Sequence, residues 1–69
     1  MENYKRVLEE MKKGLDEAEK SIQIAEKLVN LGTRMGFDMS KQREELMRLK
    51  AQHEVAKRAL ESELASLSK

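Results

Sequence analysis

Few residues in this chain of 69 could carry out chemistry. His53 is the only histidine and there is no cysteine, so a metal site would have to be built around one imidazole. The positions one helical turn to either side of His53 are Leu49 and Lys57, which are not metal ligands. No nucleophile stands beside a plausible base, and no glycine-rich loop precedes a helix in a strand context. The sequence therefore predicts no catalytic, metal or cofactor site, and a protein that is not an enzyme.

Basic side chains offer one other chemistry, which is contact with phosphate groups. They recur every seven residues in the first half of the chain, and we call this set the basic row: Arg6, Lys13, Lys20, Lys27 and Arg34. Acidic residues stand beside it, and 14 Lys+Arg against 13 Asp+Glu leave a net charge of only +1. A strong positive field and stacking aromatic residues, both typical of nucleic-acid binding, are lacking. We interpret the basic row as a solvated helix face and keep nucleic-acid binding as the alternative function.

The composition predicts long helices with wide solvated faces. Charged residues make up 39% of the chain, against about 25% in an average protein. There is no proline, and only three glycines interrupt a sequence rich in alanine, leucine, lysine and glutamate. No apolar run approaches the roughly 18 residues of a membrane span, and the N-terminus lacks the apolar stretch of a signal peptide. We expect a cytoplasmic protein without a membrane partner.

The first helix is predicted over residues 2–31 by a heptad pattern. Its apolar residues follow one another at alternating steps of four and three: Tyr4, Leu8, Met11, Leu15, Ala18, Ile22, Ala25 and Val29. This spacing is typical of a helix that packs at a shallow angle against another helix. Gly32 stands where a left-handed C-terminal cap would end this helix, and Asp38 or Ser40 could cap the next one.

A second helix is predicted over residues 41–67, after a turn at 32–40. Its apolar positions are Leu46, Leu49, His53, Ala56, Leu60, Leu64 and Leu67. When the chain folds back at the turn, facing residues of the two patterns have numbers that add to 71, as Ala18 and His53 do. Several of these pairs set a small residue against a large one, which fills a two-helix core without voids. We therefore predict an all-α fold, an antiparallel two-helix coiled-coil hairpin that forms one domain over residues 1–69.

Two interpretations compete with parts of this architecture. One continuous helix in a long parallel coiled coil would use the same heptads, but Gly32 and Gly36 would weaken it. His53 is interpreted as a core residue packed over Ala18, and the competing interpretation makes it a pH-sensing side chain inside a bundle.

Further apolar residues lie outside the heptad pattern and are concentrated near the turn. They are Ile24, Leu28, Leu31, Met35, Phe37, Met39, Met47, Ala51, Val55 and Ala59. They could widen the hairpin contact, form a surface for a different protein, or be buried against a second copy. We favour the second copy, which gives a dimeric four-helix bundle. A row of small residues would also let another helix approach closely: Gly14, Ala18, Ser21 and Ala25.

The function predicted from these patterns is interaction rather than catalysis. A two-helix hairpin of this size is marginally stable alone, which favours a homodimer. We expect the dimer to present helix surfaces to a protein partner, as an adaptor, inhibitor or assembly factor that needs no cofactor. The alternative is a nucleic-acid-binding accessory protein that uses the basic row of a four-helix bundle.

Overall fold

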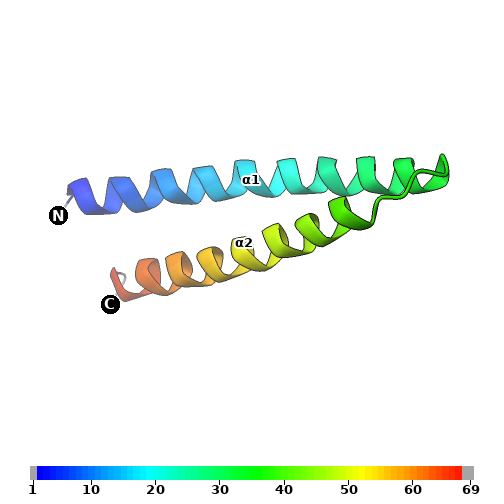
Figure 1. The fold of residues 1–69 in the computed structure, drawn as a ribbon. Coiled ribbons are helices and arrows are strands. Elements are labelled where there is room, and N and C mark those ends of the chain that lie inside the picture. Colours follow the sequence, from blue (N-terminus) through cyan, green and yellow to red (C-terminus); the bar gives the residue numbers. More distant parts are fainter. Residues whose placement is uncertain (1, 68–69) are drawn as a thin grey trace.

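The computed structural model describes residues 2–67, which form two helices joined by a short turn. Helix α1 spans Glu2–Arg34 and helix α2 spans Ser40–Leu67. They run antiparallel and pack against each other, so the start of α1 and the end of α2 lie at the same end (Figure 1). The prediction of an all-helical hairpin is confirmed, and one continuous helix is excluded. Residue 1 and residues 68–69, which the predicted domain includes, lie outside the described residues.

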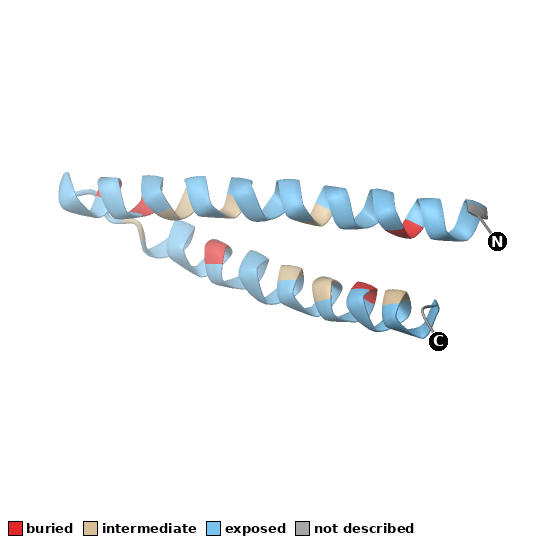
Figure 2. Cartoon of the chain, turned by 180° about the vertical axis from the view of Figure 1, so that it is seen from behind, coloured by how far each residue is buried: buried red, intermediate tan, exposed pale blue. Residues whose placement is uncertain are grey.

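The hairpin is a thin rod. Its principal extents are 53 × 15 × 13 Å and its radius of gyration is 15.9 Å, whereas a compact chain of this length has a radius of about 11 Å. The separation of the two arms grows from the turn towards the open end, where α1 begins and α2 ends (Figures 1 and 2). The turn half of the rod is therefore closed and the open half is splayed.

The end of α1 differs from the sequence prediction. The helix continues past Gly32, and the residue with a positive φ is Gly36, at 92°. The Phe37 N–H donates to the Gly32 carbonyl at 2.9 Å and the Gly36 N–H donates to the Thr33 carbonyl at 3.1 Å. This is the Schellman arrangement, in which a glycine supplies the left-handed backbone that closes a helix. The predicted cap at Gly32 is therefore wrong, because Gly36 has that role and Gly32 supplies a helical carbonyl to it.

Gly32 has a packing role instead. It is buried, and a Cβ atom placed on it would lie 2.7 Å from the sulfur atom of Met39. The half-buried Met39 side chain therefore lies directly over the α1 backbone, where a glycine leaves room for it. This contact positions the chain as it enters α2.

Helix α2 begins with a side-chain cap from Asp38, one of the two caps that the sequence suggested. The Asp38 Oδ1 atom accepts hydrogen bonds from the Ser40 hydroxyl at 2.6 Å and from the Ser40 backbone N–H at 3.1 Å. These two bonds, the hydroxyl first, favour the carboxylate and hold the pKa of Asp38 below its ordinary value. Arg43 then joins the helices, because its Nη2 atom donates to the Thr33 hydroxyl at 2.8 Å. That hydroxyl donates in turn to the Val29 carbonyl at 2.9 Å.

The core between the arms is narrow. Four hydrophobic side chains are buried, Leu8 and Val29 on α1 and Leu46 and Leu60 on α2 (Figure 2). No side chain among the described residues is fully buried. All four buried residues belong to the predicted heptad pattern, but they form a single line of contact rather than a filled interior.

Only half of each heptad pattern faces the other helix. The facing rows are Leu8, Leu15, Ile22 and Val29 on α1, with Leu46, His53 and Leu60 on α2. The intervening heptad positions are more open, and the side chains of Met11 and Leu49 are exposed. One edge of the predicted core therefore reaches solvent along the length of the hairpin.

The register of the two helices agrees with the predicted one to within about one helical turn. The His53 Nε2 atom lies 2.8 Å from the Leu15 carbonyl oxygen, and these residue numbers add to 68. Nearer the turn, Glu26 and Lys50 form an ion pair, and their numbers add to 76. The two sums bracket the predicted value of 71.

Candidate interaction surface

Most of the large exposed hydrophobic side chains of α1 gather on one side of its facing row. At about 100° per residue, positions three and six residues after a member of that row are turned to the same side of the helix. These heptad positions carry five of the large exposed hydrophobic residues between residues 3 and 35: Tyr4, Val7, Met11, Leu28 and Met35. Ile24 and Leu31 are exposed as well, but they are turned by about 150° from the facing row, away from α2. The small residues at these heptad positions are Gly14, Ala18 and Ser21. The corresponding side of α2 carries Leu49, Ala56 and Ala59. We call the combined surface the apolar face.

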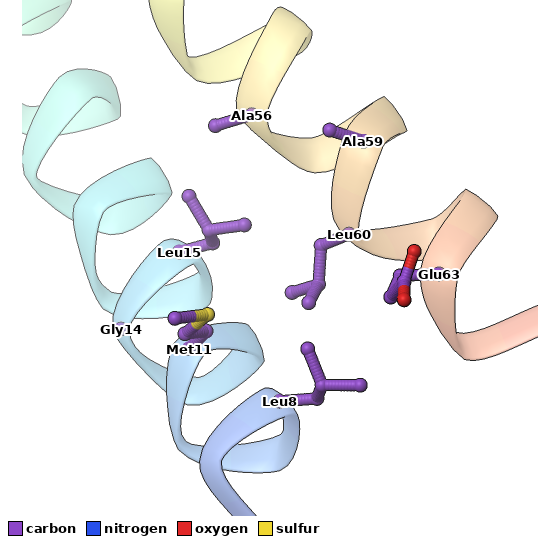
Figure 3. Close-up of a pocket in the computed structure, with 8 residues that line it drawn as sticks. All are labelled: Leu8, Met11, Gly14, Leu15, Ala56, Ala59, Leu60 and Glu63. Atoms are coloured by element: carbon purple, nitrogen blue, oxygen red, sulfur yellow. The ribbon is translucent and has the colours of Figure 1, made fainter. Parts of the chain in front are cut away.

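The two helices meet on this face at a groove in the open half (Figure 3). The groove has a volume of about 560 Å³ and is lined by Leu8, Met11, Gly14, Leu15, Ala56, Ala59, Leu60 and Glu63. Leu8 and Leu60 point towards each other, while Ala56 and Ala59 extend only a short way from α2. Because the helices diverge here and the alanines and Gly14 have little or no side chain, the space between the arms stays open.

A hydrogen bond between the arms lies at the outer end of the groove. The Tyr4 hydroxyl donates to Oε1 of Glu63 at 2.5 Å. This bond holds the proton on the phenol and raises the pKa of Tyr4 above its ordinary value of 10.0, with smaller contributions from desolvation and from the negative charge of Glu63. It joins the first turn of α1 to the last turns of α2.

The opposite side of the hairpin is polar. The ion pair of Glu26 with Lys50 links the arms on that side. A smaller hollow of about 180 Å³ also lies there, where the core residues Leu15, His53, Leu60 and Leu64 are flanked by charged ones: Lys12, Asp16, Lys57 and Glu61. Charged side chains of both signs keep their hydration in such positions. The hairpin is therefore amphipathic as a whole, with one apolar face and one polar side.

His53 ties the two arms together by its ring. A carbonyl oxygen can only accept, so the Nε2 atom that lies 2.8 Å from the Leu15 carbonyl must carry a hydrogen and donate it. This contact fixes the ring on the α1 backbone three residues before Ala18, over which the sequence had placed it.

The structure divides the residues that were predicted to form a second surface. Those on the apolar face are Leu28, Met35 and Ala59, whereas Ile24, Leu31 and Val55 are turned by about 150° from the facing rows, away from the other helix. Met47 and Ala51 are turned by about 100° and 140° from Leu46, to the other side of α2. Phe37 is exposed in the turn, and Met39 is half-buried against α1. The predicted set is therefore distributed over the apolar face, the turn and other sides of both helices.

The open half of the apolar face is the part that the sequence did not reveal. A strict heptad turns both of its apolar rows towards the partner helix, so Met11, Leu49 and Ala56 were assigned to the hairpin core. In the structure these three residues are exposed, because only one row of each helix faces the other. Gly14 and Ala59 were the available signal, since two small residues on the same side of facing helices leave a hollow between them.

The basic row lies on the side of α1 that is turned away from α2, and all five of its residues are exposed. Within the described residues, none of the five forms an ion pair. Lys13 and Lys20 have acidic residues three or four positions away, whereas the neighbours of Lys27 at these distances include Ile24 and Leu31. Positive charge is therefore least compensated near the turn.

Comparison with protein-family models, with curated proteins and with solved structures finds no significant match to this chain. Neither of the two described helices has an apolar stretch long enough to cross a membrane. Within residues 2–67, no three His, Asp or Glu side chains converge as a metal site requires. The apolar face is therefore the feature from which a function is argued.

Proposed function

We propose that this chain is a self-associating helical hairpin, in which two copies pack through their apolar faces into a homodimeric four-helix bundle that acts by binding a protein partner. The observation that carries the proposal is the area left exposed. The hairpin exposes 6008 Å² of accessible surface, whereas a compact monomer of 8.0 kDa exposes roughly 4,500 Å². The excess is on the order of 1,500 Å² per chain.

An excess of this size suits a permanent dimer. Interfaces of obligate homodimers bury about 2,000–5,000 Å² in total, or about half of that on each partner. On the apolar face, Leu28 and Met35 are 59% and 63% exposed, so most of their hydrophobic area remains to be buried. Burial of such area is the main favourable term in association. Because the core of a single hairpin is narrow, packing against a second copy stabilises the hairpin in this proposal.

The outward surfaces of the proposed dimer are the polar side, the basic row and the turn. Phe37 in the turn is exposed and lies beyond the end of α1, so it remains available to a further protein. We place the dimer in the cytoplasm, where it presents these surfaces as an adaptor, inhibitor or assembly factor. It carries out no catalysis and needs no cofactor in this proposal.

Two matched charge substitutions test the dimer. Leu28 and Met47 are 59% and 66% exposed, and each lies inside a helix, so an isolated hairpin would tolerate a glutamate at either position. Only Leu28 is on the apolar face. In sedimentation velocity we expect Leu28→Glu to dissociate the dimer and Met47→Glu to leave it intact, because a buried unpaired carboxylate opposes association. A dimer that survives both substitutions equally contradicts the proposal.

Nucleic-acid binding is the second candidate function, and the unpaired cations of the basic row favour it. The five residues follow α1 for about 42 Å at 1.5 Å per residue, on the side away from α2. Binding through phosphate contacts must weaken steeply as salt rises. A mobility shift measured at two salt concentrations, with Lys27→Gln as the variant, tests this function. Binding that changes with neither salt nor the substitution excludes the basic row as the contact.

A further inference from the structure

We infer that the second copy lies antiparallel on the apolar face, so that α1 crosses α1 and the turn of each hairpin covers the open end of the other. This inference rests on the proposed function, because it specifies how the two copies of that dimer are arranged. The sizes of the side chains, the position of the groove and the distribution of charge each favour this orientation.

The side chains of α1 on the apolar face are self-complementary in size. Two antiparallel copies of α1 bring residues level when their numbers add to 39, about a twofold axis between residues 19 and 20. The level pairs are Tyr4 with Met35, Val7 with Gly32, Met11 with Leu28, Gly14 with Ala25, and Ala18 with Ser21. Tyr4 and Met11 therefore meet large residues, and Val7 meets the buried Gly32. Small residues meet at the centre of the contact, where the two helices can approach most closely.

The hollow and the protruding parts of the apolar face lie in opposite halves of the rod. The groove is in the open half, where Met11 and Gly14 line it. The exposed side chains of Leu28 and Met35 are in the turn half. When the second copy is reversed, its Leu28 comes level with Met11 and can enter the groove of about 560 Å³. A twofold axis makes the same contact twice.

Gly14 acquires a role in this arrangement. A glycine inside a helix of 33 residues weakens it relative to alanine. Within the hairpin, a Cβ atom at Gly14 would meet nothing within 4 Å, so the hairpin alone does not require a glycine there. A second α1 that crosses at this point does favour one, because Ala25 of the second copy comes level with Gly14.

The distribution of charge favours the same orientation. Residues 18–53, which form the turn half, carry seven Lys+Arg and five Asp+Glu, whereas residues 1–17 and 54–69 together carry seven and eight. The turn half is thus positive and the open half negative, and antiparallel copies place opposite charges together.

The parallel arrangement, with both turns at one end, fits the surface less well. Its twofold axis runs along the rod and places α1 over α2 of the second copy. Leu28 would then face the turn half of α2, whose residues on that side include Gln42, Glu45 and Gln52. Polar groups buried against aliphatic side chains lose their hydrogen bonds to water, which opposes this packing. It would also bring the two positive turn halves together.

Disulfide cross-linking tests the orientation, because the chain has no native cysteine. Met11→Cys and Leu28→Cys chains are made separately, mixed, unfolded, refolded together and oxidised. We expect a disulfide between one chain of each kind, identified by its mass. Neither variant alone should cross-link, because identical sites of the two copies lie about 25 Å apart along the helix, beyond disulfide reach.

Met11→Cys mixed with Met47→Cys is the matched control, and no mixed disulfide is expected because Met47 lies off the apolar face. A disulfide in the Met11→Cys protein alone overturns the antiparallel orientation. So does the absence of the mixed product from Met11→Cys and Leu28→Cys in a protein that sediments as a dimer. Both of these results leave the proposed dimer standing. A folded monomer in sedimentation overturns the dimer and the orientation together.

Discussion

The turn and the open end of the hairpin are held together in different ways. At the turn, the left-handed Gly36 closes α1, Asp38 caps α2, and Met39 and Arg43 contact the last turns of α1. At the open end, the arms diverge around the groove and are joined by the Tyr4–Glu63 hydrogen bond and a narrow apolar contact. The turn is specified by residues close together in sequence, whereas the open end leaves apolar area that its own chain does not cover.

This difference indicates where a single copy is complete and where it is not. The contacts of the turn involve residues within about ten positions of each other, so they form without a partner. The arms beyond the turn have apolar residues on a side that faces no other helix. The four predictions below test this contrast, from the largest expected effect to the smallest.

The largest effect is expected in the core of the turn half. Leu46→Ala removes a buried side chain and leaves a cavity, which should lower the free energy of unfolding by about 2–5 kcal/mol. Chemical denaturation followed by circular dichroism measures this change. The exposed neighbour Met47→Ala is the control and should change stability by no more than about 0.5 kcal/mol. Equal losses from the two substitutions would contradict the position of the core.

Gly36→Ala should weaken the turn through the backbone alone. A side chain at a φ of 92° is strained, and the left-handed conformation costs a residue with a Cβ about 1–2 kcal/mol. Gly36→Asn is the matched control, because asparagine adopts the left-handed conformation more readily than alanine. Thermal unfolding should show a lower Tm for Gly36→Ala than for Gly36→Asn. The reverse order would mean that Gly36 does not close α1.

The Asp38 cap predicts a loss of stability in acid. Hydrogen bonds from the Ser40 hydroxyl and N–H lower the pKa of Asp38 in the folded chain. The stability that this cap contributes is therefore fully present above the ordinary pKa of 3.8. That contribution is lost as the pH falls through the lower, folded-state pKa. Asp38→Asn keeps an oxygen acceptor but does not titrate, so its Tm should fall less than the wild-type Tm between about pH 5 and pH 2. Identical acid profiles would argue against the cap.

Tyr4 predicts the smallest effect, at the open end and in base. The hydrogen bond to Glu63 raises the pKa of Tyr4. The stability that this bond contributes is therefore complete below pH 10.0 and is lost as the pH rises through the higher, folded-state pKa. Because Tyr4 is the only tyrosine and there is no tryptophan, absorbance follows its ionisation directly. The midpoint should lie above 10.0, and Glu63→Gln should lower it. A midpoint at or below 10.0 would show that the bond is not formed in solution.

The hairpin itself could be predicted from the sequence because its signals are long and regular. Heptads continue through both arms, and the level pairs that add to 71 fix the reversal near Gly36. The correct cap could not be predicted, because Gly32 and Gly36 both suit a helix end. What distinguishes them is the contact of Met39 with Gly32, which depends on how α2 packs against α1.

The candidate surface could be predicted only in part. Ile24, Leu28 and Leu31 stand outside the heptads, so the sequence marks them as a second surface, but only Leu28 lies on the apolar face. Met11 and Leu49 could not be assigned to it, because their exposure depends on how far each helix is rotated about its own axis. Heptad spacing leaves that rotation open when a second apolar row adjoins the first.

Sedimentation equilibrium of the full chain, with circular dichroism on the same samples, tests the central claim most directly. The proposed bundle predicts a helical species with twice the chain mass of 8.0 kDa at micromolar concentration, and helix content that falls as dilution dissociates it. A helical monomer whose stability does not change with concentration would contradict the claim, because the apolar face would then be stable in water without a second copy.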